Sequence, residues 1–175
     1  GAAGAAGLDA WLPLLVFGLA ARFTNRIPLH EPYSLLSNPW VLLALAILLG
    51  VEIFADKIPA IDTINDVIHT LIRPTAGAIL FAANANAVSN MNPALAMVLG
   101  LLAAGSVHVV KASTRPAITA TTGGLLNPLV SIIEDMVAAG VTIRALIAPI
   151  RAAPLFSLLV LGLGAVVRPF PPPPP

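Results

Sequence analysis

The stretch of sequence that decides the fold class is LLSNPWVLLALAILLGVEIFA, residues 35–55. It is apolar over most of its length, and a helix needs about 20 mainly apolar residues to cross the hydrocarbon core of a bilayer. Trp40 near its start suits one membrane interface, and Asp56-Lys57 directly after it marks the other. The stretch therefore predicts a transmembrane helix.

The composition of the whole chain supports this interpretation. Of its 175 residues, 58% are hydrophobic and only 10% are charged, whereas a soluble domain carries about 25% charged residues. So few charged side chains cannot cover the water-exposed surface of a soluble protein, and a surface that faces lipid does not need them. The net charge of +1 gives no case for a nucleic-acid partner. The absence of cysteine excludes disulfides, thiolate metal sites and thiol nucleophiles.

Other apolar stretches predict an all-α bundle of four to six membrane helices. They are residues 8–21, 74–88 and 93–110, followed by residues 126–140 and 155–167, whose lengths leave open whether they cross. The stretches show no strict alternation of apolar and polar residues, which favours helices over a barrel. We expect one multi-pass domain of the cell membrane over residues 1–170, followed by an extended proline tail at residues 171–175.

Residues 61–72 differ from these stretches. Their isoleucine, valine and leucine residues follow helical spacing, and Asp62, Asn65, Asp66 and His69 fall elsewhere on the wheel. This predicts an amphipathic helix that lies at the membrane interface or packs on the bundle. Pro74 would then kink or restart the chain, and residues 141–153 could form a second interfacial piece.

Two segments point to an internal repeat. Residues 51–62 contain Val-Glu and then Pro-Ala-Ile-Asp, while residues 107–119 contain Val-His and then Pro-Ala-Ile-Thr. Each segment follows an apolar stretch that opens at a proline, and parallel repeats of this kind occur in transporters. In a chain so rich in alanine, isoleucine and proline, coincidence is the alternative explanation.

Two acids near the end of residues 35–55 form the first candidate site for an ion or substrate. Glu52 and Asp56 are four residues apart, so their carboxylates share one helix face. An ionisable side chain at the centre of a span costs about 2.5–3.5 kcal/mol to insert, which makes it a functional candidate. Two carboxylates this close repel, so one should hold a proton or both should share a cation. Alternatively, Lys57 neutralises the pair.

A basic stripe forms the second candidate. His108, Lys111 and Arg115 are three and four residues apart, so they face one way. The stripe could pair with Glu52 and Asp56, or hold an anionic headgroup or solute. A structural ion pair that only fixes helix packing is the alternative. In each case we expect Glu52, Asp56 and Lys57 to converge with the basic stripe rather than face lipid, because their insertion cost demands partners.

A polar region follows the stripe. Residues 119–124 carry hydroxyls and paired glycines, and unwound backbone at membrane depth is tolerated where it lines a cavity. A helix that starts near Pro128 would aim its positive end at this break. The new helix would present a polar face made of Asn127, Ser131, Glu134 and Asp135. A plain surface loop with a solvated face is the alternative.

Catalytic and metal chemistry find little support. Asp66 and His69, with Asp62 nearby, could ligate a metal, but a solvated amphipathic face explains these residues as well. The chain has only three histidines, which argues against a histidine-rich zinc site. No Ser-His-Asp spacing, phosphate loop or hydrolase motif is present, so the sequence names no cofactor and no enzymatic activity.

Several motifs recur in an order that marks a family. They are Gly7-Leu-Asp-Ala-Trp-Leu-Pro-Leu-Leu, Glu52-x3-Asp-Lys-Ile-Pro-x2-Asp62, His69-x3-Arg-Pro74, His108-x2-Lys-x3-Arg115 and Asn127-x3-Ser-x2-Glu-Asp135. Together they resemble a bacterial membrane family called domain of unknown function four-one-two-six, from about Gly7 to Asp135. The resemblance implies that the chain is a membrane protein and supports the choice of these polar residues as candidates, but it implies no activity.

The leading functional hypothesis is a small transporter or channel for an ion or small polar solute. In it, Glu52 and Asp56 form a coupling site that binds a proton or cation beside residues 119–124. The alternative is an accessory subunit, as a homo-oligomer or in a larger membrane complex, that binds lipid or a pigment through His108 or His69. An intramembrane lipid-modifying enzyme is the third hypothesis.

Overall fold

The computed structural model describes residues 1–24, 27–88 and 91–147, without the side chains of residues 59, 60, 62, 63 and 86–88. This part of the chain is all helical and has no strand, so the predicted fold class is confirmed at that level. The helices are α1 (Ala2–Ala5), α2 (Trp11–Phe23), α3 (Pro39–Ala55), α4 (Pro59–Val88), α5 (Pro93–Thr122) and α6 (Asn127–Ile147), with a short 3-10 helix at Tyr33–Ser37. The predicted stretch at residues 155–167, the proline tail and the end of residues 141–153 lie outside the described residues.

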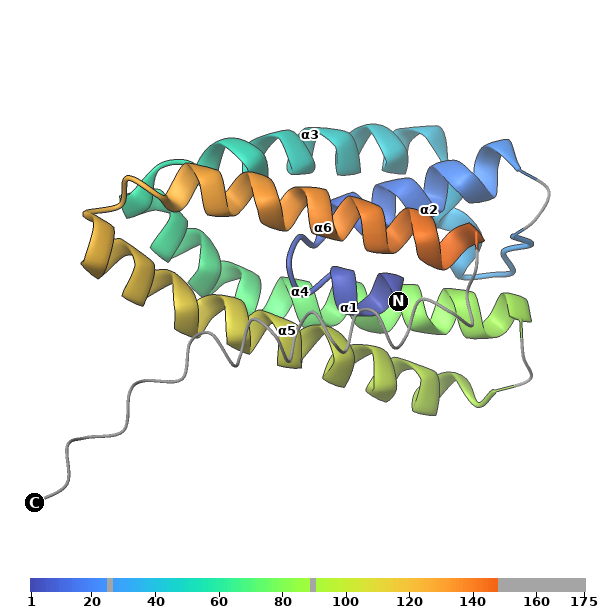
Figure 1. Cartoon of the computed structure of the whole chain (residues 1–175). Helices are drawn as coiled ribbons and strands as arrows, with labels where there is room; N and C mark the ends of the chain where they lie inside the picture. Colours follow the sequence, from blue (N-terminus) through green and yellow to red (C-terminus); the bar gives the residue numbers. More distant parts are fainter. Residues whose placement is uncertain (25–26, 89–90, 148–175) are drawn as a thin grey trace, which may run out of the picture.

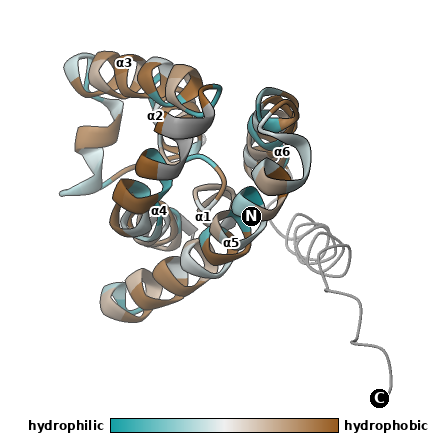
Figure 2. Cartoon of the chain, turned by 90° about the vertical axis from the view of Figure 1, so that its left-hand side faces the viewer, coloured by the Kyte–Doolittle hydropathy of each residue, from teal (hydrophilic) through white to brown (hydrophobic). Residues whose placement is uncertain are grey.

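The five longer helices run side by side along one direction (Figure 1). Seen end-on, they surround the short helix α1, which lies between α4, α5 and α6 (Figure 2). Residues 3–10, made mostly of alanine and glycine, are all buried. The small N-terminal residues, which precede the predicted stretch at residues 8–21, therefore lie at the centre of the bundle.

Asn-Pro pairs start α3 and α5, two of the four helices that carry the site. The Asn38 side chain accepts a hydrogen bond from the backbone N–H of Trp40, and Asn92 accepts bonds from Ala94 and Leu95. In both cases the proline that follows occupies the first turn, where its missing N–H costs nothing. At the other end of α5, Gly123 has a φ of 62°, a conformation that glycine adopts without strain.

Helices α4 and α5 are longer than the sequence predicted. The amphipathic residues 61–72 do not form a separate helix that ends at Pro74, because α4 continues through this proline to Val88. Residues 119–122, predicted as unwound, are the last turn of α5, and only the glycine turn that follows is non-helical. That prediction was therefore wrong, whereas α6 begins at Asn127 as expected. The two proposed repeat segments also differ, since residues 51–62 span the break before α4 and residues 107–119 lie within α5.

Helices α4 and α5 touch backbone to backbone at two glycines, which we call the glycine crossing. A Cβ at Gly77 would lie 2.3 Å from the Ala104 Cβ and 2.7 Å from the Gly100 carbonyl oxygen. A Cβ at Gly100 would lie 2.3 Å from the Gly77 carbonyl oxygen. Such close approach is possible only without side chains, and it gives van der Waals contact that does not depend on water.

The outer faces of the bundle are apolar. Large exposed hydrophobic side chains occur on each long helix from α3 to α6, as the brown outer ribbon of α3 shows in Figure 2. They include Trp40, Leu43, Ile47, Val51, Phe54, Val67, Leu71, Leu95, Leu102, Val109, Leu129, Ile133 and Met136. Within the described residues, one helix, α5, is long and apolar enough to cross a membrane, and the apolar α2 and α3 are shorter.

Candidate functional site: a buried network of charged side chains

Charged side chains from four helices face one another inside the bundle, from the place where α3 ends and α4 begins to the middle of α4 and α5. Figure 1 shows where α3 and α4 meet. On each helix these residues recur every three or four positions, so they share one face, and that face points inward. We call them the charge network. Its members are Glu52 and Asp56 from the end of α3, Asp66, His69 and Arg73 from α4, His108, Lys111 and Arg115 from α5, and Glu134 from α6.

Arg73 is the centre of one half of the charge network. Its side chain is fully buried, with an exposed fraction of 0%. One terminal nitrogen lies 2.8 Å from the Asp66 carboxylate and the other 2.9 Å from Glu52 Oε1. His69 Nδ1 lies 2.9 Å from the same Glu52 oxygen, and its ring meets Trp11 edge to face. The planar guanidinium fork thus joins two acids that a lysine could not hold in this geometry.

His108 is held as a neutral imidazole by its hydrogen bonds. Its Nδ1 lies 3.1 Å from an Arg73 nitrogen, which can only donate, so this ring nitrogen accepts. The other ring nitrogen lies 3.2 Å from the hydroxyl of Thr70, which itself donates to the Asp66 carbonyl oxygen. The imidazole N–H therefore donates to Thr70. With both ring nitrogens engaged, His108 has none left for a metal or a pigment.

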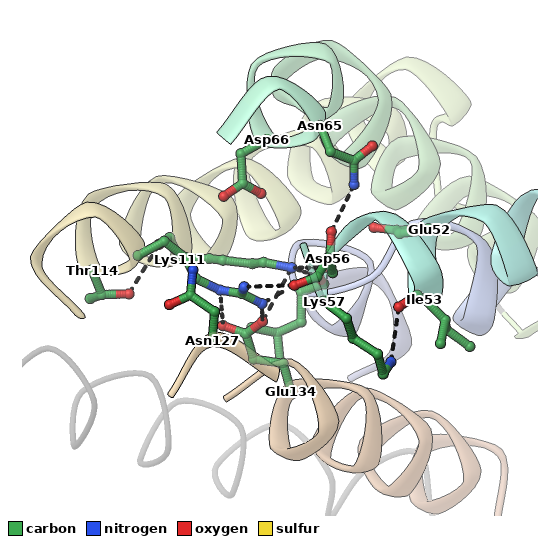
Figure 3. A network of polar contacts seen from close by, with 12 residues as sticks. Glu52, Ile53, Asp56, Lys57, Asn65, Asp66, Lys111, Thr114, Asn127 and Glu134 are labelled. Carbon is green, nitrogen blue, oxygen red and sulfur yellow. Dashed lines mark hydrogen bonds and ion pairs between the residues drawn. The ribbon is translucent and has the colours of Figure 1, made fainter. Parts of the chain in front are cut away.

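Asp56 is the centre of the other half (Figure 3). One of its carboxylate oxygens lies 2.9 Å from Lys111 Nζ, and the other accepts a 2.7 Å bond from the Asn65 amide. Lys111 also lies 3.2 Å from Glu134, and Arg115 binds the same Glu134 carboxylate through two nitrogens. Glu134 thereby ties α6 to α5 and, through Asp56, to α3.

The predicted convergence of the acids with the basic stripe is present in the structure, except for Lys57. The ammonium of Lys57 points away from the charge network and donates a 2.9 Å bond to the Ile53 carbonyl of its own chain segment (Figure 3). Glu52 and Asp56 are not a bare repelling pair, because Arg73 Nη2 lies 2.9 Å from one and 3.9 Å from the other. Cations separate them, so the premise of a mutual proton or cation site between these two acids does not hold.

The polar face of α6 lies on the inner side of the helix. Asn127 is buried and exchanges hydrogen bonds of 2.9 and 3.2 Å with the Thr119 hydroxyl of α5. Ser131 is buried too, and its hydroxyl has no partner among the described residues. Asp135 is half-buried beside Glu134. The alternative of a solvated face is therefore wrong for Asn127 and Ser131, and likewise for Asp66 and His69, which are buried on α4.

The segment between α1 and α2 reaches the same place. Lys111 Nζ donates a 3.0 Å bond to the Leu8 carbonyl oxygen. The next residue, Asp9, has an exposed fraction of 0%, and its Oδ1 accepts 2.9 Å bonds from the backbone N–H groups of Trp11 and Leu12. Asp9 therefore caps the start of α2 with one oxygen. Its other oxygen, Oδ2, has no hydrogen-bond partner among the described residues.

Sequence reasoning missed Arg73 as a site residue, and it considered Asp66 and His69 only as ligands of a metal or pigment, not as members of an ion-pair network. Asp66, His69 and Arg73 are spaced by three and four, like His108, Lys111 and Arg115 on α5. The same spacing was the available signal, but the apolar residues between them favoured an interfacial helix with its polar face in solvent. Asp9 gave a weaker signal as the one charged residue in an otherwise apolar stretch.

The arrangement can bind charge but offers little for catalysis. Four carboxylates face three side chains with permanent positive charge, and the ion pairs satisfy most of their atoms. Removing one partner of a buried ion pair costs about 3–5 kcal/mol, because the other charge is left uncompensated. Among the described residues, no group of three or more acids and histidines is placed to hold a metal ion.

The comparison with known families gives one match. A family model described as "Domain of unknown function (DUF4126)" matches residues 1–168. No curated protein and no solved structure matches the chain.

Proposed function

Since the chain belongs to the family of the domain of unknown function DUF4126, for which no activity is named, we propose a function from the site itself. The protein is a small multi-pass transporter or channel of the cell membrane that carries an ion or small polar solute. One observation supports this most directly. A connected network of charged side chains lies inside a bundle whose outer faces are apolar, and two buried acid oxygens, Glu52 Oε2 within the network and Asp9 Oδ2 outside it, have no hydrogen-bond partner among the described residues.

The distribution of residues on α3 supports the membrane part of the proposal. Most of its large apolar side chains are exposed, with Leu42 and Leu45 as buried exceptions, while its acid, Glu52, has an exposed fraction of only 3%. A surface helix of a soluble protein shows the reverse arrangement. Three helices are also long enough to cross the hydrocarbon core of a bilayer, which is about 30 Å thick. A helix rises about 1.5 Å per residue, so α4 and α5 are about 45 Å long each and α6 is about 31 Å long.

The position of the charge network supports the transport part. Charged side chains inside a membrane bundle mark ion or proton pathways more often than they mark packing. Here they come from four helices and from the segment before α2, so a substrate at Glu52 would contact most of the bundle. Relative movement of α6, which Glu134 and Asn127 tie to α5, would open or close access to the acids.

A second function is favoured by the completeness of the ion pairs. If the charge network only locks the helices, the protein is an accessory subunit, and its outer apolar faces pack against other copies or other membrane proteins. Interfaces between membrane subunits and surfaces that face lipid have the same apolar character. The two functions predict different effects of Glu52→Gln on ion flux.

The test is ion flux in liposomes that contain the purified protein and a pH-sensitive dye. Under an imposed pH gradient with K⁺ or Na⁺ present, wild type should carry flux above protein-free liposomes, and Glu52→Gln should lose most of it. Glu31→Gln, which removes an exposed acid, is the matched control and should carry wild-type flux. Equal flux in wild type and Glu52→Gln would eliminate the role of Glu52. No flux in wild type, together with a stoichiometric partner in mild detergent, would favour the accessory subunit.

A further inference from the structure

Asp9 has a property that ion pairing does not explain. It is fully buried, and it forms no ion pair with a cation among the described residues, whereas two other acids, Glu52 and Asp135, face it. The Leu8 carbonyl oxygen, one residue before Asp9, lies 3.0 Å from the Lys111 ammonium, which lies 2.9 Å from Asp56, one helical turn after Glu52. An ionised carboxylate buried in this way would pay a large desolvation cost with no cation to repay it.

The Asp9 and Glu52 carboxyl groups each have one oxygen without a donor. Asp9 Oδ1 is occupied by the backbone N–H groups of Trp11 and Leu12, and Glu52 Oε1 is occupied by Arg73 and His69. The remaining oxygens, Asp9 Oδ2 and Glu52 Oε2, are both buried and have no hydrogen-bond partner among the described residues. Two ionised carboxylates can only accept, whereas a protonated carboxyl group also donates.

We infer that Asp9 and Glu52 form one proton-binding site, in which a single carboxyl hydrogen is shared between Asp9 Oδ2 and Glu52 Oε2. One O–H donor satisfies both oxygens and removes the repulsion between the two acids. Glu52 keeps its bonds to Arg73 and His69, so the hydrogen belongs mainly to Asp9. The site replaces the Glu52–Asp56 pair as the place where the protein would load a proton.

Charged and titratable groups from every surrounding helix face this site. They are Glu52 on α3, His69 and Arg73 on α4, Lys111 on α5 beside the Leu8 carbonyl, and Asp135 on α6. Arg73 and Lys111 each form an ion pair with another acid, Asp66 and Asp56 respectively, and neither forms an ion pair with Asp9 among the described residues. Asp135 is the rival proton carrier, because it is half-buried and has no ion pair within the described part of the chain.

The binding site is inferred from the burial of the two acids and from their two oxygens without a donor, while its use in transport rests on the proposed function. Proton binding is therefore measured separately, by infrared spectroscopy of the purified full chain in lipid. Wild type should show the C=O band of a protonated carboxyl group at neutral pH, shifted in D₂O and lost as the pH rises. Asp9→Asn and Glu52→Gln should each lose the band, and Glu31→Gln should keep it.

The outcomes separate the alternatives. A band that survives Asp9→Asn and disappears in Asp135→Asn would overturn the inference, and so would the absence of a band in wild type. Asp9→Asn keeps the oxygen that caps α2 and adds an N–H that can donate to Glu52, so it should fold, as circular dichroism would check. If the C=O band is present but the liposomes show no proton flux, the transport proposal is wrong and the proton site is supported. If the liposomes show flux but the band is absent, transport is supported and the proton site is wrong.

Discussion

Helices α4 and α5 are held together in two different ways along their length. At the glycine crossing, Gly77 and Gly100 bring the backbones into contact, with Ala104 and the Cβ of Phe81 beside them. One helical turn before Gly77 on α4, Arg73 contacts His108 on α5 within the charge network. The two regions are neighbours on the same pair of helices, yet the first is made of apolar groups and the second of charged and polar ones.

The difference shows which interactions are useful when the outside of a bundle is apolar. Between such helices, burial of apolar side chains gains little if lipid surrounds them, because lipid is as apolar as the interior. Close packing and polar contacts then remain as sources of stability and specificity. The glycine crossing supplies close packing and contains no group that can bind a ligand. The charge network supplies polar contacts, and its charged atoms can also bind an ion or a solute.

The largest expected loss of stability comes from breaking the charge network at its centre. Arg73→Leu leaves Glu52 and Asp66 buried without their shared cation, which should cost about 3–5 kcal/mol. Thermal unfolding in detergent, followed by circular dichroism, measures the loss. Arg144→Leu removes an exposed arginine of α6 and should stay within about 0.5 kcal/mol of wild type. Equal stability of Arg73→Leu and wild type would mean that the network does not hold the helices.

A smaller loss is expected at the glycine crossing. Gly77→Ala puts a methyl group 2.3 Å from the Ala104 Cβ, so the helices must separate, at a cost of about 1–3 kcal/mol. The same substitution at Gly50, where nothing lies within 4 Å of the new Cβ, should stabilise α3 by about 0.5–1 kcal/mol. The two substitutions should therefore change the free energy of unfolding in opposite directions. If Gly77→Ala also stabilises the protein, the two helices are not in close contact at the glycine crossing.

The smallest effect is expected where α5 meets α6. Thr119→Val removes the hydroxyl that exchanges hydrogen bonds with the buried Asn127 amide, a loss of about 1 kcal/mol. Thr121→Val removes an exposed hydroxyl that bonds only to carbonyl groups of its own helix, and should leave stability almost unchanged. Proteolysis of the turn at Gly123 in native protein would report any loosening of α6. Equal cleavage of both variants would show that Asn127 does not fasten this end.

Much of the fold could be predicted because its cause is local. The apolar stretches, their proline starts and the three- and four-residue spacing on α3, α5 and α6 follow from the chain itself. The helix ends were harder to predict. Pro74 and Pro116 are helix breakers by local rules, but α4 and α5 continue through them, which no local rule predicts.

By itself, the sequence determined that this chain forms apolar helices with acids on one segment and bases on another, and that these charges need partners. Only the tertiary structure decided which partners they found. Arg73, rather than Lys57, neutralises Glu52, because residue 73 lies within α4 opposite the end of α3, whereas Lys57 points along its own segment. The segment of Leu8 and Asp9 reaches the charge network at Lys111 because the small residues of α1 let the N-terminal segment enter the middle of the bundle. Contacts between residues so far apart in the chain depend on how whole helices pack, and spacing along one helix carries no information about its neighbour.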